Sequence, residues 1–164
     1  MLVAVLSDIH DDEIHLLCAL ALAQEGGCTH LLFAGDMAES GTLRLLLEEW
    51  PHGMDLVFGN NEGERSTFAR IVQGREQVRL HGDGADFLLD GRRIYLCHYP
   101  HAALRAAVSG AYDAAFYGHT HQAERNLMGN CLLANPGEVC GQRSGTPRFG
   151  LYNTQDNSFH LIRI

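Results

Sequence analysis

The chain has 164 residues, of which 46% are hydrophobic and 20% are charged. This length and composition are typical of one globular domain with a buried core, and they exclude a disordered or low-complexity chain. The formal net charge of -8, from 12 basic and 20 acidic residues, disfavours stable binding to nucleic acid or to anionic membranes. We therefore expect a single domain over residues 1–164.

Cysteine usage indicates a reducing compartment. The five cysteines include no CxxC pair and do not form the closely spaced, even-numbered set of a secreted disulfide framework. The apolar N-terminal segment has no basic leader and is too short for a signal sequence or a membrane span. These features predict a cytoplasmic protein with reduced thiols and no membrane partner.

The first half of the chain alternates strand and helix signals. An apolar run predicts a buried strand over 2–7. Four apolar residues then recur at helical spacing: Ile14, Leu17, Cys18 and Leu22. They predict a helix that begins near the acidic segment at Asp12 and ends at Gly26. Further strands are expected over 30–34 and 55–58, and further helices over 40–50 and 64–72.

The second half is richer in hairpin signals. A hairpin with an Asp90-Gly91 turn is expected over 87–97. A helix over 102–108 and a strand over 114–117 follow, and two more hairpins are expected around residues 129–130 and 155–157. Strand–helix units followed by hairpins predict an α/β fold, a four-layer αββα sandwich of two mixed β-sheets flanked by helices.

Asp, Asn or His residues follow five of the predicted strands. They are Asp8, His10, Asp36, Asn60, His98, His119 and His121. Because ligands of open α/β sheets bind at the carboxyl ends of strands, we expect these side chains to converge. Glycine directly precedes Asp36, Asn60 and His119, which allows a sharp turn or a close approach of the backbone.

The set offers oxygen and nitrogen donors and no thiolate, which suits Mn²⁺, Fe, Zn²⁺ or Ni²⁺. It exceeds the roughly three protein ligands of a catalytic zinc, whereas two ions that share a bridging carboxylate fit the count. Taken singly, most of these motifs are compatible with a helix cap, a turn or an ordinary buried histidine, and only Gly118-His-Thr-His121 is moderately specific. The ordered set of five motifs favours a metal centre.

The order of these motifs resembles that of the calcineurin-like metallophosphoesterases, in their small single-domain phosphodiesterase branch. The matching motifs are Asp8-Ile-His10, Gly35-Asp36, Gly59-Asn-Asn-Glu62, His98 and Gly118-His-Thr-His121. The segment from Ala134-Asn-Pro-Gly137 to Gln142-Arg143 also resembles the family's Asn-Pro-Gly-Ser…Arg segment. The resemblance extends from residue 2 to about residue 155.

This resemblance implies a metal-dependent phosphodiesterase with two metal ions that share Asp36. One ion would take Asp8, His10, Asp36 and His121, and the other Asp36, Asn60, His98 and His119. The catalytic residues would be Asp36, Asn60, Asn61 and His98. A metal-bridging hydroxide would attack phosphorus in line with the leaving oxygen. Mn²⁺ is favoured, with Ni²⁺, Fe and Zn²⁺ as alternatives. The implied substrate is a small phosphodiester or nucleotide-like molecule, and a homo-oligomer is compatible with these features.

Asn61 departs from the family pattern, because many members carry at this position a histidine that contacts the substrate. An amide can bind substrate but cannot protonate a leaving group, which argues against protein-phosphatase activity. We prefer His98 to His101 as the lone histidine ligand, because His98 directly ends its strand. Candidates for the surrounding wall are Asn61, Tyr99, His101 and Arg143. The remaining histidines, His30 and His81 among them, have no ligand-like neighbour in the sequence.

Three alternatives compete with a phosphodiesterase. A phosphomonoesterase or nucleotidase would use the same ligands. A non-catalytic scaffold of the same fold, as in one eukaryotic sorting subunit, is favoured by lost ligands, but every ligand position is filled here. A structural or storage site predicts bound metal without hydrolysis.

Overall fold

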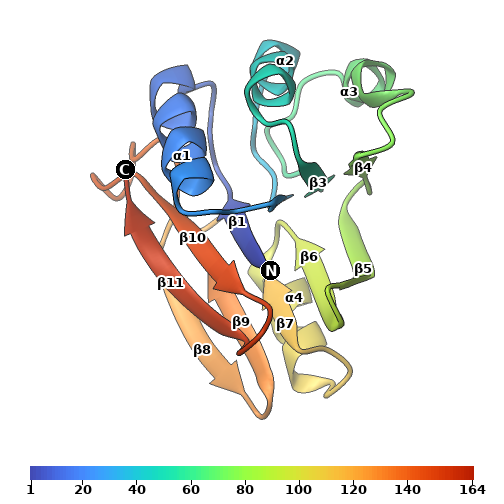
Figure 1. Cartoon of the computed structure of the whole chain (residues 1–164), viewed down its shortest axis with the longest axis vertical. Helices are drawn as coiled ribbons and strands as arrows, with labels where there is room; N and C mark the ends of the chain where they lie inside the picture. Colours follow the sequence, from blue (N-terminus) through green and yellow to red (C-terminus); the bar gives the residue numbers. More distant parts are fainter.

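Two β-sheets pack face to face, with helices on their outer faces (Figure 1). A computed structural model describes all 164 residues of the chain. Helices α1, α2 and α3 lie together on one side of the molecule, and α4 lies on the other. The predicted αββα sandwich of two mixed sheets is therefore confirmed.

The six-stranded sheet has the order β11-β10-β1-β2-β3-β4. Its parallel part consists of β1 (Leu2–Leu6), β2 (His30–Phe33), β3 (Gly53–Leu56) and β4 (Val78–Leu80). The connecting helices are α1 (Glu13–Glu25), α2 (Ser40–Glu49) and α3 (Arg65–Val72). The C-terminal hairpin of β10 (Arg148–Asn153) and β11 (Ser158–Arg163) adds to β1 in antiparallel fashion.

The five-stranded sheet has the order β5-β6-β7-β9-β8. Its strands are β5 (Gly84–Leu89), β6 (Arg92–Cys97), β7 (Ala114–Phe116), β8 (Glu124–Met128) and β9 (Cys131–Asn135). Helix α4 (Pro100–Val108) connects β6 to the parallel β7 and packs against this sheet. None of the helices is long and apolar enough to span a bilayer.

Strand β1 shows how the sequence builds the layers. Val3 and Val5 face the second sheet, where they join Phe116, Tyr152 and others in the apolar layer between the sheets. The alternate residues of the strand point toward the helices and join the larger apolar layer beneath them. Both faces of β1 are therefore buried, which accounts for its continuous apolar run.

The predicted elements are present with ends that differ by up to three residues, and one strand was missed. The third strand covers Gly53–Leu56 rather than 55–58, because Val57 and Phe58 leave the regular ladder and donate to Phe33 and Gly82 carbonyls respectively. Strand β4 was not predicted, since its three residues alternate apolar and polar but are too short a run to stand out in the sequence.

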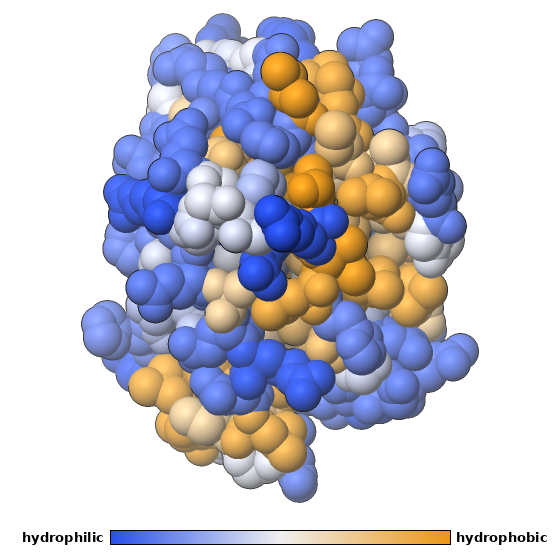
Figure 2. Space-filling model, turned by 90° about the vertical axis from the view of Figure 1, so that its left-hand side faces the viewer, coloured by the Kyte–Doolittle hydropathy of each residue, from blue (hydrophilic) through white to orange (hydrophobic).

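Helix α1 is where predicted, but the apolar residues that predicted it lie on its solvent side. Ile14 is 75% exposed, and Leu17 and Leu22 are 40% and 38% exposed. The buried side consists of Leu16, Ala19, Leu20 and Ala23. Because the helix is apolar all round, its periodicity cannot identify the inward face. Figure 2 views the face that carries α1 and the C-terminal hairpin, and hydrophobic residues are exposed along its right-hand side and near its lower end.

Candidate metal centre

The carboxyl ends of strands from both sheets meet at one place, and the polar residues that follow them come together there. Asp8 and His10 follow β1, Asp36 follows β2, and Asn60 lies in the loop after β3. The second sheet contributes His98, directly after β6, and His119 and His121 after β7. Atom-to-atom contacts connect these residues into one cluster.

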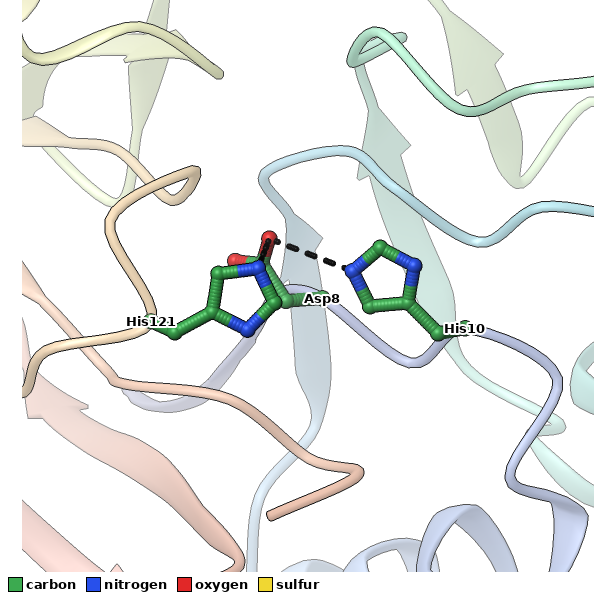
Figure 3. A group of neighbouring side chains, drawn as sticks. All are labelled: Asp8, His10 and His121. Carbon is green, nitrogen blue, oxygen red and sulfur yellow. Dashed lines mark ion pairs between the residues drawn. The ribbon is translucent and has the colours of Figure 1, made fainter. Parts of the chain in front are cut away.

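One half of the cluster centres on Asp8, which is fully buried. Its Oδ1 lies 3.7 Å from His10 Nε2 and 3.4 Å from His121 Nε2 (Figure 3). The two imidazole rings stack at 5.1 Å between centroids. Asp8 Oδ1 and His10 Nε2 are both buried without a hydrogen-bond partner. Such orphaned polar atoms are rare in folded proteins and call for a missing ligand.

The other half centres on His98, which is also fully buried. Its Nδ1 donates to the carbonyl oxygen of Ala34 at 2.8 Å. The proton of a neutral imidazole is therefore on Nδ1, and the Nε2 lone pair faces acceptors. These are Asp36 Oδ1 at 3.4 Å and Asn60 Oδ1 at 3.1 Å. The His119 ring stands edge-on to His98, 5.0 Å between centroids.

Asp36 connects the two halves. Its Oδ1 faces His98, and its Oδ2 lies 3.7 Å from His10 Nε2. Backbone amides of Asn60 and Asn61 donate to Oδ1, and the Asn61 side-chain amide donates to Oδ2 at 2.7 Å. Burial raises the pKa of Asp36, but the neighbouring His98 and the hydrogen bonds from Asn61 outweigh burial and hold the pKa well below its usual range. Asp36 therefore stays ionised between the two halves of the cluster.

The charges of the carboxylates also act on the histidines. The Asp8 carboxylate, 3.7 Å from Nε2, raises the pKa of His10, while burial and the nearby Arg143 charge oppose the rise. Burial lowers the pKa of His98, but the neighbouring Asp36 carboxylate outweighs burial and raises it. Burial and the neighbouring His98 lower the pKa of His119. The carboxylates thus favour positive charge at two of the imidazoles, those of His10 and His98.

Backbone strain is concentrated at the same residues. Five of them have left-handed φ values: Asp8 (53°), His10 (47°), Asp36 (62°), His119 (67°) and His121 (60°). Asp and His tolerate this region better than most residues, whereas β-branched side chains are rarely found there. Strain of this kind persists only where the surrounding structure enforces it, and it is typical of functional sites.

Two glycines allow the strand ends to approach one another. A Cβ on Gly118 would collide with Ser7 Oγ and lie 2.7 Å from Asp8 Oδ2. A Cβ on Gly59 would collide with Asp36 Oδ1. The expectation that these glycines permit close backbone approach is therefore confirmed.

Two glutamates support the cluster, and the sequence analysis assigned neither a role. Glu62 accepts backbone N–H groups of Asp36, Met37 and Gly59. Glu138 accepts from His121 Nδ1 at 2.5 Å. Glu62 lies within the Gly59-Asn-Asn-Glu62 motif, and Glu138 follows Gly137 where the resembling family has serine. Both positions could thus have been singled out from the sequence.

The predicted wall residues have different placements. The Asn61 amide is engaged by Asp36. The Tyr99 side chain is 43% exposed, and its ring lies 5.0 Å from the His119 ring between centroids. Arg143 is exposed, and its charge acts on His10. His101 lies exposed in the first turn of α4, outside the cluster that contains His98.

His30 and His81 correct the sequence interpretation, because each does have an acidic partner. Their Nε2 atoms lie 2.7 Å and 2.6 Å from the two carboxylate oxygens of Asp55. Arg79 donates to the same carboxylate at 2.6 Å. The sequence could not reveal this, since Asp55 is part of a predicted buried strand and about 25 residues from each histidine. This second cluster is separate from the candidate metal centre.

A model of the calcineurin-like phosphoesterase superfamily domain matches residues 1–157. The chain belongs to this superfamily. The prediction of a hydrolase that acts on phosphoric esters is thereby confirmed at the level of the family.

Known proteins of similar sequence and structure agree with this assignment. A phosphodiesterase of Methanocaldococcus jannaschii is 25% identical over 164 residues, covering 99% of this chain and 98% of its own. The solved structure of an archaeal phosphodiesterase superposes with a TM-score of 0.92 at 25% identity, with both chains fully covered.

More distant structures share the fold. A phosphoesterase of E. coli has a TM-score of 0.69 at 21% identity, with 100% of each chain covered. Vps29 of Entamoeba histolytica, in complex with zinc, has a TM-score of 0.70 at 19% identity, covering 100% of this chain and 98% of that one.

Proposed function

We propose that this protein is a metal-dependent phosphodiesterase that uses two divalent cations, with Mn²⁺ favoured. The observation that carries the proposal is the convergence of carboxylate, amide and imidazole acceptor atoms on one place. Asp8 Oδ1 is orphaned opposite His10 and His121, and the His98 Nε2 lone pair faces Asp36 and Asn60. Oxygen and imidazole donors in this arrangement suit divalent cations such as Mn²⁺ or Zn²⁺.

The two halves of the cluster define the proposed ligand sets. Asp8, His10, Asp36 and His121 would hold one cation. Asp36, Asn60, His98 and His119 would hold the other, so that Asp36 bridges them. When bound, the cations supply positive charge for the phosphate oxygens and make a water acidic enough to attack phosphorus near neutral pH.

The side chains of the protein then position the reaction. Asp36 keeps one oxygen toward each half because three N–H groups hold it. His98 keeps its lone pair directed at the cluster because its other nitrogen is tied to Ala34. Asn61 fixes Asp36 and, at the exposed rim, is also proposed to contact the substrate. The positive charge of Arg143 is suited to attract an anionic phosphodiester.

The absence of an acid at position 61 bears on the substrate. An amide cannot donate a proton to a departing alkoxide, so the leaving group must be stable as an anion or take its proton from water. This favours small diesters with acidic leaving groups. The full-length similarity to a named phosphodiesterase also supports diester over monoester hydrolysis. Five free cysteines support the accompanying proposal of a cytoplasmic location.

The test is hydrolysis of a chromogenic phosphodiester by chelator-stripped protein, with and without added Mn²⁺. The matched monoester serves as the substrate control. We expect Mn²⁺ to restore cleavage of the diester and to give little cleavage of the monoester. The His98→Ala variant should be inactive, whereas His101→Ala, outside the cluster, should retain activity.

Other outcomes would redirect the assignment. Faster monoester cleavage would identify a phosphomonoesterase. Folded, metal-loaded protein that cleaves neither ester with Mn²⁺, Ni²⁺ or Zn²⁺ would overturn the proposal in favour of a binding or structural role.

A further inference from the structure

Glu138 is a fully buried carboxylate in the loop that follows β9. Four donors surround it. One oxygen accepts the backbone N–H groups of Arg143 at 2.8 Å and Ser144 at 2.5 Å. The other accepts His121 Nδ1 at 2.5 Å and the Cys140 thiol at 3.3 Å. A carboxylate oxygen accepts about two hydrogen bonds, so Glu138 is fully satisfied.

The contact with His121 decides which nitrogen of that imidazole carries the proton. An ionised carboxylate can only accept, so the His121 proton lies on Nδ1. The Nε2 lone pair then points at Asp8 Oδ1, 3.4 Å away, which has no hydrogen-bond donor. Glu138 therefore keeps His121 in the tautomer and ring orientation that a metal ligand requires.

The charge of Glu138 has no cationic side chain to offset it. Its single ion-pair partner is His121 Nδ1, and no arginine side chain reaches it. A buried carboxylate beside a neutral imidazole is costly to desolvate. A cation bound at His121 Nε2 would offset this cost. The carboxylate in turn makes the histidine a stronger ligand.

We propose that Glu138 is a positioning residue that orients His121 and raises the affinity of the adjacent metal position. This inference rests on the proposed function. Through its other oxygen, the same carboxylate anchors the loop that carries Arg143. Glu138 thereby fixes a metal ligand and the start of the proposed substrate wall at once.

The test is titration of chelator-stripped protein with Mn²⁺. Binding is monitored by calorimetry and by the electron paramagnetic resonance signal of free Mn²⁺. Glu138→Gln keeps the shape of the side chain and removes its charge. We expect binding at one of the two positions to weaken about 10- to 100-fold, as is usual for loss of a partner to a ligating histidine. The other position should bind as in the wild type. Glu124→Gln, the same change in an exposed strand, should leave both unchanged.

Two further variants separate positioning from general loosening of the loop. In a His121→Ala background, Glu138→Gln should cause no additional loss of Mn²⁺ binding, because Glu138 acts through His121. Cys140→Ala disturbs the same cluster without touching His121 and should leave binding unchanged.

The outcomes distinguish this inference from the proposed function. Wild-type affinity in Glu138→Gln would overturn the inference while leaving the phosphodiesterase intact. An equal loss of Mn²⁺ affinity in Cys140→Ala would overturn it as well. So would a loss in the double variant His121→Ala/Glu138→Gln that equals the sum of the two single losses. Failure of the wild type itself to bind Mn²⁺ would instead contradict the proposed function.

Discussion

Asn61 holds Asp36 at two points, with its backbone N–H on Oδ1 at 2.9 Å and its side-chain amide on Oδ2 at 2.7 Å. The residue that differs from the family pattern is thus directly attached to the proposed bridging carboxylate. Its side chain does more than line the substrate wall, because it restricts the rotation of the group on which both proposed ligand sets depend.

Removing the Asn61 side chain should therefore weaken metal binding as well as turnover. Asn61→Ala frees Asp36 Oδ2 while the backbone hydrogen bond remains. We expect Mn²⁺ affinity to fall about tenfold or more, the usual size of a lost outer hydrogen bond to a ligand. Calorimetric titration measures this. Unchanged affinity combined with a raised KM would show that Asn61 acts on substrate alone.

Asp8→Asn should stabilise the metal-free protein while abolishing its response to metal. The amide nitrogen would replace Oδ1, the orphaned atom, and donate to the lone pair of His121. Asparagine also tolerates the left-handed backbone at this position. We expect a gain of about 1 kcal/mol in the free energy of unfolding without metal, as for one added hydrogen bond.

Urea denaturation with and without Mn²⁺ checks this expectation. The wild type should gain stability from Mn²⁺, whereas Asp8→Asn should gain little. A variant less stable than the metal-free wild type would contradict the interpretation that Asp8 Oδ1 lacks a hydrogen-bond donor opposite His121 Nε2.

Gly118→Ala should damage both stability and metal binding. The new methyl group would strike Ser7 Oγ and crowd Asp8. Overpacking of this kind costs about 1–3 kcal/mol. Gly41→Ala is the matched control, because a Cβ there meets nothing within 4 Å in helix α2. It should stabilise the protein by about 0.5 kcal/mol, since alanine has the higher helix propensity. Equal melting temperatures for the two variants would contradict this interpretation of Gly118.

Asp55 should matter for stability rather than for activity. It is fully buried and bound by His30, His81 and Arg79. Burial raises its pKa, but these three partners outweigh burial and hold the pKa well below its usual range. Asp55→Asn should cost about 3 kcal/mol near neutral pH. The same change at the exposed Asp83, which pairs with Arg65, should cost less than about 1 kcal/mol.

The pH dependence of this effect has a definite sign. Because the folded-state pKa of Asp55 is depressed, its contribution is fully present above the unfolded value of about 3.9. It is lost as the pH falls through the lower folded value. The stability gap between wild type and Asp55→Asn should therefore persist at neutral pH and narrow only in strong acid. Denaturation curves across this range measure the gap, and a gap that widens on acidification would refute the assignment.

Much of the fold could be predicted because its signals are local. The Asp90-Gly91 turn and the buried run of β1 depend on neighbouring residues only, and both are found as expected. The exposed apolar side of α1 could not be predicted, because a helix that is apolar all round gives no indication of direction. The choice between its faces is made by the sheet beneath.

The candidate site also has one part that local sequence signals predicted and one part that they did not. Strand ends marked by Asp, Asn or His identified residues such as Asp8 and His121 as members of one cluster. The contacts of these residues were harder to foresee: the position of Glu138 can be noted in the sequence, but its contact with His121 forms through a loop that returns from β9. Asp55 likewise contacts His30 of β2 and His81, the residue after β4. Contacts of this kind depend on tertiary packing and leave no periodic signal in the sequence.

The proposed ligands come from two sheets that pack against each other through an apolar layer. Asp8 and Asp36 belong to one sheet and His98 and His121 to the other, while Phe116 and Tyr152 pack in the layer between them. The distance between the sheets is therefore also the distance between metal donors. A shift of an outer helix leaves the distance between those donors unchanged. A larger or smaller side chain between the sheets changes that distance. Selection for activity should accordingly restrict the side-chain volumes of this inner layer more strictly than those beneath the helices.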